Sequence, residues 1–250
     1  MVADQMLNKD TAMPMVRRSF YTRYMKRLLD IVLSGFAIVV LSPVFVIVTF
    51  FELIFHGWPV LYVSQRPGKN GQIFHIYKFR SMTNKTDEHG ELLPEEYRLT
   101  KFGSFLRRTS LDELPELWSI FAGKMSIIGP RPLLIEYLEL YTPRHQMRHI
   151  VRPGLACVRV KKNKDDILSD SWTWREQFEN DIYYIENISF LLDMKMIVQT
   201  VILAMKGSSY RTSDTRVQYN GKNLDETRSK QEFLSGFTSD RQRQTVNING

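Results

Sequence analysis

The stretch IVLSGFAIVVLSPVFVIVTFF, residues 31–51, decides the fold of this chain, because it is apolar almost throughout. As a helix, roughly 20 such residues are about as long as the hydrocarbon core of a bilayer is thick. The stretch is too long for the apolar core of a signal peptide, and Glu52 to His56 follow it in place of a small-residue cleavage site. The sequence therefore predicts an uncleaved membrane anchor.

The dipeptide Ser42-Pro43 falls near the middle of this anchor. A proline there removes a backbone N–H donor and bends a helix, while the serine hydroxyl can satisfy a carbonyl that the bend frees. Cations flank the anchor on both sides: Arg17, Arg18, Arg23, Lys26 and Arg27 precede it, and Arg66, Lys69, Lys78 and Arg80 follow it. Since cations favour the cytoplasmic side, this pattern favours a re-entrant helix hairpin over a spanning helix with a tolerated proline.

The basic segment before the anchor also contains aromatic residues, namely Phe20, Tyr21 and Tyr24. Aromatic rings at headgroup depth, with cations over anionic lipid, are typical of a juxtamembrane segment. A nucleic-acid-binding arm is the alternative interpretation. Because the anchor follows directly, we expect anionic membrane lipids as partners and no nucleic acid.

Composition and net charge narrow the kind of partner and exclude some kinds of site. The 250 residues carry a net charge of +7 and a pI near 9.4, which indicates an anionic partner such as a lipid headgroup or a phosphorylated substrate. The lone Cys157 excludes an internal disulfide and a zinc site built on cysteines. His145 and His149 are four residues apart, but no HExxH motif accompanies them, so we expect no metal there.

Shifts in composition predict four segments along the chain. They are a mobile leader (1–16), a juxtamembrane segment with the re-entrant membrane helix (17–56), a cytoplasmic domain (57–207) and a polar, disordered tail (208–250).

Within the cytoplasmic domain, residues 60–63 and 73–77 predict a short β-hairpin about the turn 66–72. Residues 133–150 are partly periodic and predict helix, with a boundary at Pro143. Residues 171–186 and 190–206 have helical spacing, and their apolar side chains suit a core or interfacial helix. We therefore expect an α+β fold that is mostly helical, with a re-entrant membrane hairpin and a compact cytoplasmic domain.

The run TKFGSFLRRTSLDELPELWSIFAGKMSIIGPRPLL, residues 100–134, concentrates the polar chemistry. Asp112-Glu113 stands at its centre. Arg107 and Arg108 come just before these acids, and Arg131 follows in Gly129-Pro130-Arg131-Pro132. Arginines that bind anions, next to carboxylates that can attack or hold a metal, suit phosphate chemistry.

A structural interpretation of the same acids is also available. Ser110-x-x-Glu113 matches a capping box, in which both acids would simply favour the positive end of a helix. Pro115 argues against Ser110 as the cap, since it would then lie too deep in the helix, and Asp112 or Leu114 fits the cap better. Either interpretation places the acids at a helix N-terminus, which also attracts phosphate.

Lys78 and Arg80 leave the second predicted strand two residues apart, so they are expected to share one face. They form either an anion-binding pair or a solvated edge.

Five segments together resemble the bacterial sugar transferase family, the small monotopic phosphoglycosyl transferases. They are KRLLDIVLS, the anchor with Ser42-Pro43, SQRPGKNGQIFHIYKFRSM, the run 100–134, and WREQFENDIYYIENISFLLDMKMI. The resemblance extends from about residue 23 to residue 206. It implies an enzyme on the cytoplasmic face of the bacterial inner membrane that transfers a sugar 1-phosphate from a nucleoside diphosphate sugar, usually a UDP-sugar, to a polyprenol phosphate such as undecaprenyl phosphate. This transfer would begin the assembly of a capsule, exopolysaccharide, O-antigen or glycoprotein glycan.

The resemblance also implies roles for single residues. Asp112 matches the nucleophile that forms a covalent phosphosugar-aspartyl intermediate, and Glu113 matches the acid that holds Mg²⁺. Positions that match substrate-binding residues of the family are Lys78, Arg80, Arg107, Arg131 and Asp181. Ser42 and Pro43 match the break of its re-entrant helix. Downstream glycosyltransferases and a second copy of the chain are further candidate partners.

The chain departs from the family pattern after Arg152-Pro153-Gly154. The family usually continues as Thr-Gly-x-Ala-Gln-Val-x-Gly-Arg-Asn, whereas residues 155–164 read LACVRVKKNK here. This stretch belongs to substrate recognition in the family, so the change concerns the identity of the donor. It also raises the alternative of a catalytically degraded member that acts as a membrane scaffold. In addition, Lys124 replaces an acid that is common before Met125-Ser126.

Overall fold

The computed structural model describes residues 13–157, 173–205 and 220–224. The chain divides into two compact units, one of Met1–Val158 with Asp181–Tyr210, the other of Arg159–Asn180 with Arg211–Gly250. In chain order the elements are η1 (Tyr21–Met25), α2 (Lys26–Val40), α3 (Ser42–Phe55), β1 (Leu61–Pro67), η2 (Lys69–Gly71), β2 (Ile73–Phe79), α4 (Glu95–Arg98), α5 (Lys101–Thr109), η3 (Leu111–Glu113), α6 (Glu116–Phe121), β3 (Ser126–Ile128), η4 (Ile135–Leu140), α7 (Pro143–Gln146), η5 (Met147–Ile150), β4 (Gly154–Ala156), α8 (Trp174–Asn187) and α9 (Phe190–Met205). Mixed helix and strand, mostly helix, confirms the α+β class.

The second unit is described only in part. The first half of α8 belongs to it, and there the rings of Trp174 and Phe178 stack with centroids 5.8 Å apart. The N–H of Arg175 donates to the carbonyl of Leu224 at 2.9 Å. Most of the predicted leader, tail and altered loop 155–164 lies outside the described residues. The division into four segments therefore stays a prediction.

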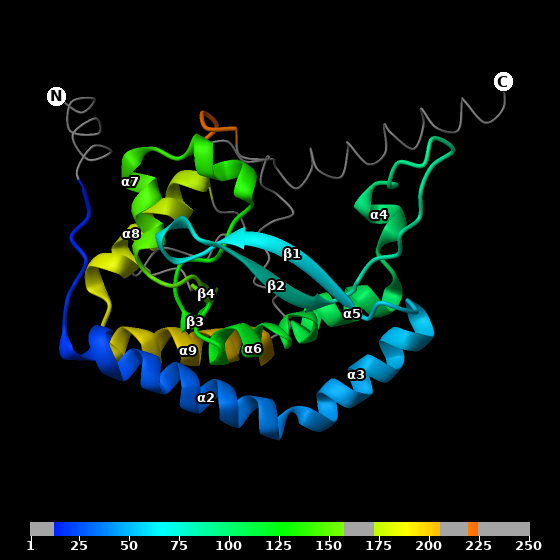
Figure 1. Cartoon of the computed structure of the whole chain (residues 1–250), viewed down its shortest axis with the longest axis horizontal. Coiled ribbons are helices and arrows are strands. Elements are labelled where there is room, and N and C mark those ends of the chain that lie inside the picture. The colour runs from blue at the N-terminus through cyan, green and yellow to red at the C-terminus, as the bar shows by residue number, and fades with distance from the viewer. Residues whose placement is uncertain (1–12, 158–172, 206–219, 225–250) are drawn as a thin grey trace. The chain divides into compact units, whose positions relative to one another are not determined.

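Helices α2 and α3 form a pair bent by 60° (Figure 1). Pro43 lies in the first turn of α3, where its missing N–H costs no helical hydrogen bond. The hydroxyl of Ser42 donates to the carbonyl of Val39 at 2.7 Å, as the sequence predicts. Among the described residues no single helix is long and apolar enough to cross a membrane, whereas this bent pair meets that test when taken together. The break at Ser42-Pro43 is confirmed.

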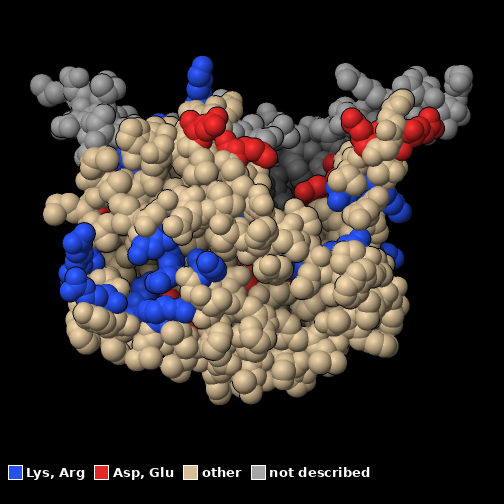
Figure 2. All heavy atoms as spheres, viewed as in Figure 1, with Lys and Arg blue, Asp and Glu red and all other residues tan. Residues whose placement is uncertain are grey.

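These two helices turn apolar side chains outward and polar ones inward. Val39 and Val46 are 72% and 69% exposed, whereas Asp30 and Glu52 are only 4% and 0% exposed. Figure 2 shows an uncharged band along the edge that α2 and α3 form in Figure 1. So much exposed apolar surface is unusual in water and indicates a membrane or protein contact.

The inward polar groups bind α2 to the rest of the first unit. The carboxylate of Asp30 accepts hydrogen bonds from the Ser126 hydroxyl and the Ile127 N–H, both at 3.0 Å. The guanidinium of Arg27 donates to the carbonyls of Ile120 and Phe121 at 2.7 and 2.8 Å. Helix α2 is therefore fixed to both β3 and α6, which flank the candidate site.

The predicted hairpin is confirmed, with longer strands than the sequence indicated. Strands β1 and β2 pair antiparallel about the tight turn η2, where Asn70 and Gly71 have φ of 56° and 72°. Residues that stand opposite each other share a face, so Lys78 lies beside Tyr62 and Arg66 beside Phe74. Phe74 packs in the core with Ile76, Ile120 and Met125, so this face points toward α6.

Two glycines bring β3 and β4 together as a parallel pair. Ser126 stands opposite Gly154, and Ile128 opposite Ala156. A Cβ added to Gly154 would lie 2.1 Å from the nitrogen of Gly129, so no side chain fits between the two backbones. This close approach fixes the start of the Pro130-Arg131-Pro132 loop.

One sequence prediction near the acids is wrong in detail. The helix after the acids begins at Glu116 with Pro115 as its cap residue, not at Asp112 or Leu114, and Ser110 makes no capping bond with its side chain. The acids lie in a 3₁₀ turn because the Glu113 N–H donates to the Ser110 carbonyl at 3.2 Å. Residues 133–150 form the three short helical elements η4, α7 and η5, and the predicted boundary at Pro143 is confirmed, because α7 begins there with Thr142 as its cap.

Candidate active site

Asp112 and Glu113 lie in η3, the turn between α5 and α6. Ser110 ends α5 in the left-handed conformation, with φ of 57°, and thereby turns the chain sharply before the acids. Asp112 is 3% exposed, and the Glu113 side chain is 12% exposed. The adjacent α6 is only six residues long. The acids are therefore held by a turn between two helices and not by a helix cap.

Glu113 joins two cations from other elements. Its Oε1 accepts from Lys78 Nζ of β2 at 2.8 Å and from Arg131 Nη2 of the loop after β3. Lys78 Nζ also lies 3.0 Å from Oε1 of Glu116. The Glu113 carboxylate is the main cause that raises the pKa of Arg131, and burial raises the pKa of Glu116. The structure thus brings together three residues that are far apart in sequence and that were predicted for the site.

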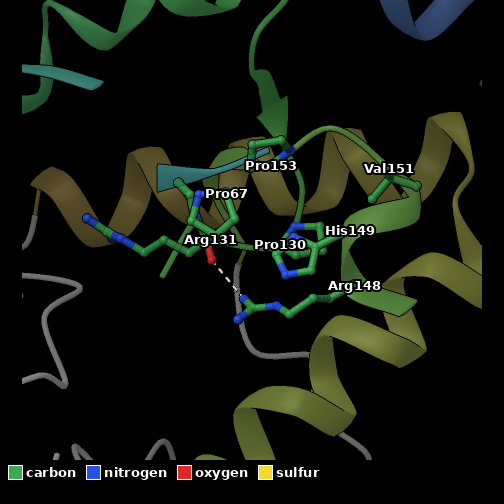
Figure 3. Close-up of a pocket in the computed structure, with 8 residues that line it drawn as sticks. Pro67, Pro130, Arg131, Arg148, His149, Val151 and Pro153 are labelled. Atoms are coloured by element: carbon green, nitrogen blue, oxygen red, sulfur yellow. Dashed lines mark hydrogen bonds between the residues drawn. The ribbon is translucent and has the colours of Figure 1, made fainter. Parts of the chain in front are cut away.

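Arg131 is held through its backbone by a second buried ion pair. Arg148 of η5 donates to the Arg131 carbonyl at 2.7 Å, and its guanidinium also lies 2.7 Å from Oδ2 of Asp181. Both side chains of this pair are 2% exposed. Figure 3 shows the Arg148–Arg131 bond, with the Arg131 side chain directed away from the recess that His149 and four prolines line. Asp181 is therefore connected to Glu113 only indirectly. It pairs with Arg148, which holds the backbone of Arg131, and Arg131 pairs with Glu113.

The other two predicted cations lie among different partners. Arg107 Nε donates to the Ser81 hydroxyl at 2.8 Å, and Arg107 lies on the last turn of α5, just before the acids. Arg80 donates to the carbonyls of His56 and Pro59, at 3.4 and 3.0 Å. Arg80 therefore braces the link between α3 and β1, and it shares no carboxylate with Lys78.

Arg66 of β1 is a further cation of this region, which the sequence pattern assigned to the flank of the anchor and not to the site. Burial lowers the pKa of Arg66, whereas the charges of Glu116 and Glu136 act in the opposite direction, and Arg131 is close enough to lower it further. Strand register places Arg66 on the same face as Lys78. The alternation of side chains along β1 is the signal that could have found it, once the register was known.

Among the described residues there is no group of three or more His, Cys, Asp or Glu side chains that could hold a metal ion. His145 and His149 therefore have no third ligand of these types in the described chain. Asp112 and Glu113 offer two carboxylates, and Mg²⁺ is commonly bound by one or two protein carboxylates together with substrate phosphates and water. The donor chemistry of these two acids fits a magnesium ion that arrives with a phosphorylated substrate.

Comparison with known proteins gives the family. The model of the family described as bacterial sugar transferase matches residues 21–207. The uncharacterized sugar transferase EpsL of Bacillus subtilis (strain 168) is 37% identical over 199 residues, which cover 79% of this chain and 96% of EpsL. The exopolysaccharide production protein PSS of Rhizobium leguminosarum bv. phaseoli is 36% identical over 71% of this chain and 94% of its own length.

Longer relatives contain a similar region as one part of a larger protein. The UDP-glucose:undecaprenyl-phosphate glucose-1-phosphate transferase of Klebsiella pneumoniae is 35% identical over 70% of this chain, and the match covers 39% of that relative. This chain thus matches nearly the whole of some relatives and less than half of others.

Proposed function

Because this chain belongs to the bacterial sugar transferase family, we propose that it transfers a sugar 1-phosphate from a nucleoside diphosphate sugar, namely a UDP-sugar, to undecaprenyl phosphate. The relative from Klebsiella pneumoniae is named for a reaction of this kind, and the relative from Rhizobium leguminosarum for exopolysaccharide production. The product would be the first lipid-linked sugar of a surface or secreted glycan.

The observation that carries this proposal is the buried Asp112 beside the Glu113 cluster. A carboxylate can attack a diphosphate only after the like charge of the substrate is neutralised. Lys78 and Arg131 converge on Glu113, and Arg66 lies on the same strand face as Lys78. Together they supply positive charge next to the nucleophile.

The proposed reaction has two steps. In the first, a carboxylate oxygen of Asp112 attacks the sugar-proximal phosphorus, a bond forms between them, and the bond to the nucleoside monophosphate breaks with its electron pair on the leaving phosphate. In the second, a phosphate oxygen of the polyprenol phosphate attacks the same phosphorus and displaces Asp112 as a free carboxylate. Splitting the transfer lets a soluble donor leave before the membrane-bound acceptor arrives.

Mg²⁺ is the cofactor in this proposal, with Glu113 as its main protein ligand and Asp112 beside it. When bound, the ion would offset the negative charge of the diphosphate. Lys78 and Arg131 hold the Glu113 carboxylate in place before substrate arrives. The same two side chains can then bind phosphate oxygens, since both carry several N–H donors.

We further propose that α2 and α3 form a re-entrant hairpin in the cytoplasmic leaflet of the bacterial inner membrane. The 60° bend and the outward apolar side chains support this placement. Single cysteines in place of the exposed Phe20 and Trp58 would lie on the two flanks of the pair. An impermeant maleimide should label both only from the cytoplasmic side. Labelling from opposite sides would refute the hairpin.

The transferase reaction is tested with the full chain in membranes, radiolabelled UDP-sugars, undecaprenyl phosphate and Mg²⁺. Wild type should convert at least one donor into a lipid-linked product, and Asp112→Asn should lower the rate by a factor of about 10³ or more, as loss of a covalent nucleophile does. Asp87→Asn, at an exposed loop carboxylate, is the matched control. Full activity of Asp112→Asn would refute the mechanism, and inactivity of wild type with every donor would favour the scaffold alternative.

A further inference from the structure

A second group of cations lies at the end of α6, on residues that take no part in the Glu113 cluster. Arg27 comes from the first turn of α2, and Arg152 from the loop before β4. Arg27 Nη2 lies 3.0 Å from the position that a Cβ on Gly123 would take, and Arg152 Nε donates to the Gly123 carbonyl at 2.9 Å. Both guanidinium groups therefore adjoin one residue, and the next residue is the exposed Lys124.

Helix capping explains only part of this arrangement. Arg27 donates to the carbonyls of Ile120 and Phe121, which are orphan acceptors at the end of α6. A guanidinium has five N–H donors. The carbonyl bonds use two donors of Arg27 and one of Arg152, so both groups keep donors for another acceptor.

The three cations Arg27, Lys124 and Arg152 form no ion pair with a carboxylate of the described residues. Burial and the charge of Arg152 lower the pKa of Arg27, and Asp30 opposes this only in part. Asp30 itself is buried and accepts from Ser126 and Ile127. Two like charges held side by side are stabilised by an anion that bridges them.

The surroundings indicate where such an anion comes from. Leu28, Trp118 and Phe121 are apolar residues of α2 and α6 that are 53%, 55% and 44% exposed. Figure 2 shows Lys and Arg side chains gathered near the start of α2, directly above the uncharged band. Cations that border an exposed apolar face are placed as those of a membrane protein are when they contact the phosphate layer of a bilayer.

We propose that Arg27, Lys124 and Arg152 form a binding site for the phosphate group of an anionic membrane lipid. The two guanidinium groups would hold the phosphate oxygens as a fork, while Lys124 adds a third charge at the rim. This site would fix the rotation of α2 about its axis and the depth of β3, to which Asp30 ties the helix. The inference uses the proposed membrane placement of α2 but not the proposed reaction.

The test measures lipid retained by the full chain in native mass spectrometry, with no sugar donor present. Wild type should keep a phosphatidylglycerol molecule. Lys124→Gln/Arg152→Gln should bind it roughly tenfold or more weakly, because each cation near a lipid surface raises the affinity about fivefold. Lys69→Gln/Lys101→Gln, which removes the same charge from exposed positions in η2 and α5, should bind as wild type does. Equal loss in both double variants would overturn the site.

Three further measurements test whether the phosphate belongs to an anionic lipid, whether it is a soluble phosphate, and whether the charge of Lys124 is needed. Phosphatidylcholine should be kept several-fold more weakly than phosphatidylglycerol, and equal retention would overturn the preference for an anionic lipid. Inorganic phosphate should not displace the lipid at equal concentration; displacement would assign the site to a soluble phosphate. Lys124→Asp, which places a carboxylate beside the guanidinium groups, should abolish retention while the protein keeps its thermal unfolding midpoint. Unchanged lipid binding in that variant would also overturn the proposal.

Discussion

Asp181 acts on the candidate site through the backbone of another residue. It neutralises Arg148, which in turn donates to the carbonyl of Arg131. The family pattern points to Asp181 as a substrate-binding position, but sequence alone gives no sign that a buried arginine stands in between. Arg148 lies in a stretch whose helical period is broken, so no pattern marks it as internal. Only the tertiary packing of η5 reveals the pair.

We predict that Asp181→Asn destabilises the protein by about 3 kcal/mol, because it leaves the buried Arg148 guanidinium without its counter-charge. Denaturant unfolding measures this loss. Since Arg131 would also lose its support, KM for the donor should rise more than kcat falls. Glu139→Gln, at an exposed carboxylate of η4, is the control and should change neither quantity. Wild-type stability in Asp181→Asn would show that the pair contributes little.

The lowered pKa of His149 predicts that the folded protein loses stability in acid. Burial, and then the charge of Arg148, lower the pKa of His149 to about 4, whereas an unfolded histidine titrates near 6.5. The unfolded chain therefore binds this proton first. The contribution of His149 is complete above about pH 6.5 and is lost as the pH falls toward 4.

The measurement compares thermal unfolding midpoints at pH 7 and pH 5. His149→Gln cannot take up the proton, so its midpoint should fall less between these pH values than that of wild type. His75→Gln, at an exposed position of β2, should keep the full wild-type fall. The same fall in all three proteins would exclude His149 as the group responsible.

At the scale of elements, the end of α3 is fixed to the start of α5 by a buried polar chain. His56 Nδ1 lies 2.9 Å from Glu52 Oε2, and His56 Nε2 lies 2.9 Å from Thr100 Oγ1. The side chains of Glu52 and His56 are fully buried. Thr100 also accepts from the Gly103 N–H at 2.8 Å and so caps α5. This chain sets the position of the helix that leads to Asp112.

We predict that His56→Leu costs about 3 kcal/mol of unfolding free energy, because Glu52 and Thr100 both lose a buried partner. Glu52→Leu/His56→Leu should recover part of that loss, since the buried carboxyl is then gone as well. Denaturant unfolding of the two variants measures the difference. If the double variant were less stable than His56→Leu, removal of the carboxyl would add to the loss and the coupling would be refuted.

Local rules predicted some elements and failed at others for identifiable reasons. Proline restricts the backbone of a helix strongly, so both the break at Ser42-Pro43 and a bond from the Ser42 hydroxyl to a freed carbonyl followed from sequence, whereas the structure identifies that carbonyl as Val39. The turn residues between β1 and β2 likewise determine the hairpin. At Asp112 the capping rules gave several starts for the next helix, and the choice depended on Ser110 adopting a left-handed conformation that no neighbouring residue type requires.

At the scale of the whole molecule, hydrogen bonds connect the bent pair of α2 and α3 to the elements that hold the acids. Arg27 and Asp30 bind α2 to α6 and β3, and His56 binds α3 to α5. The acids lie between α5 and α6. The proposed re-entrant hairpin would thus hold Asp112 at a constant height relative to the lipid phosphates. These bonds could not be derived from sequence, because each joins residues that are far apart along the chain.

A fixed nucleophile of this kind predicts how the two half-reactions separate. With donor and Mg²⁺ but no polyprenol phosphate, the full chain should release about one nucleoside monophosphate per active molecule and then stop, because Asp112 stays bonded to the sugar phosphate as an acyl phosphate. Rapid quenching measures this burst, and mass spectrometry of the quenched protein should find a sugar phosphate on Asp112. Adding polyprenol phosphate should restart release, since the lipid phosphate frees the carboxylate. Continuous release that needs the acceptor from the first turnover, with no burst and no modified protein, would favour direct attack of the lipid on the donor, and Asp112 would then serve only to position charge.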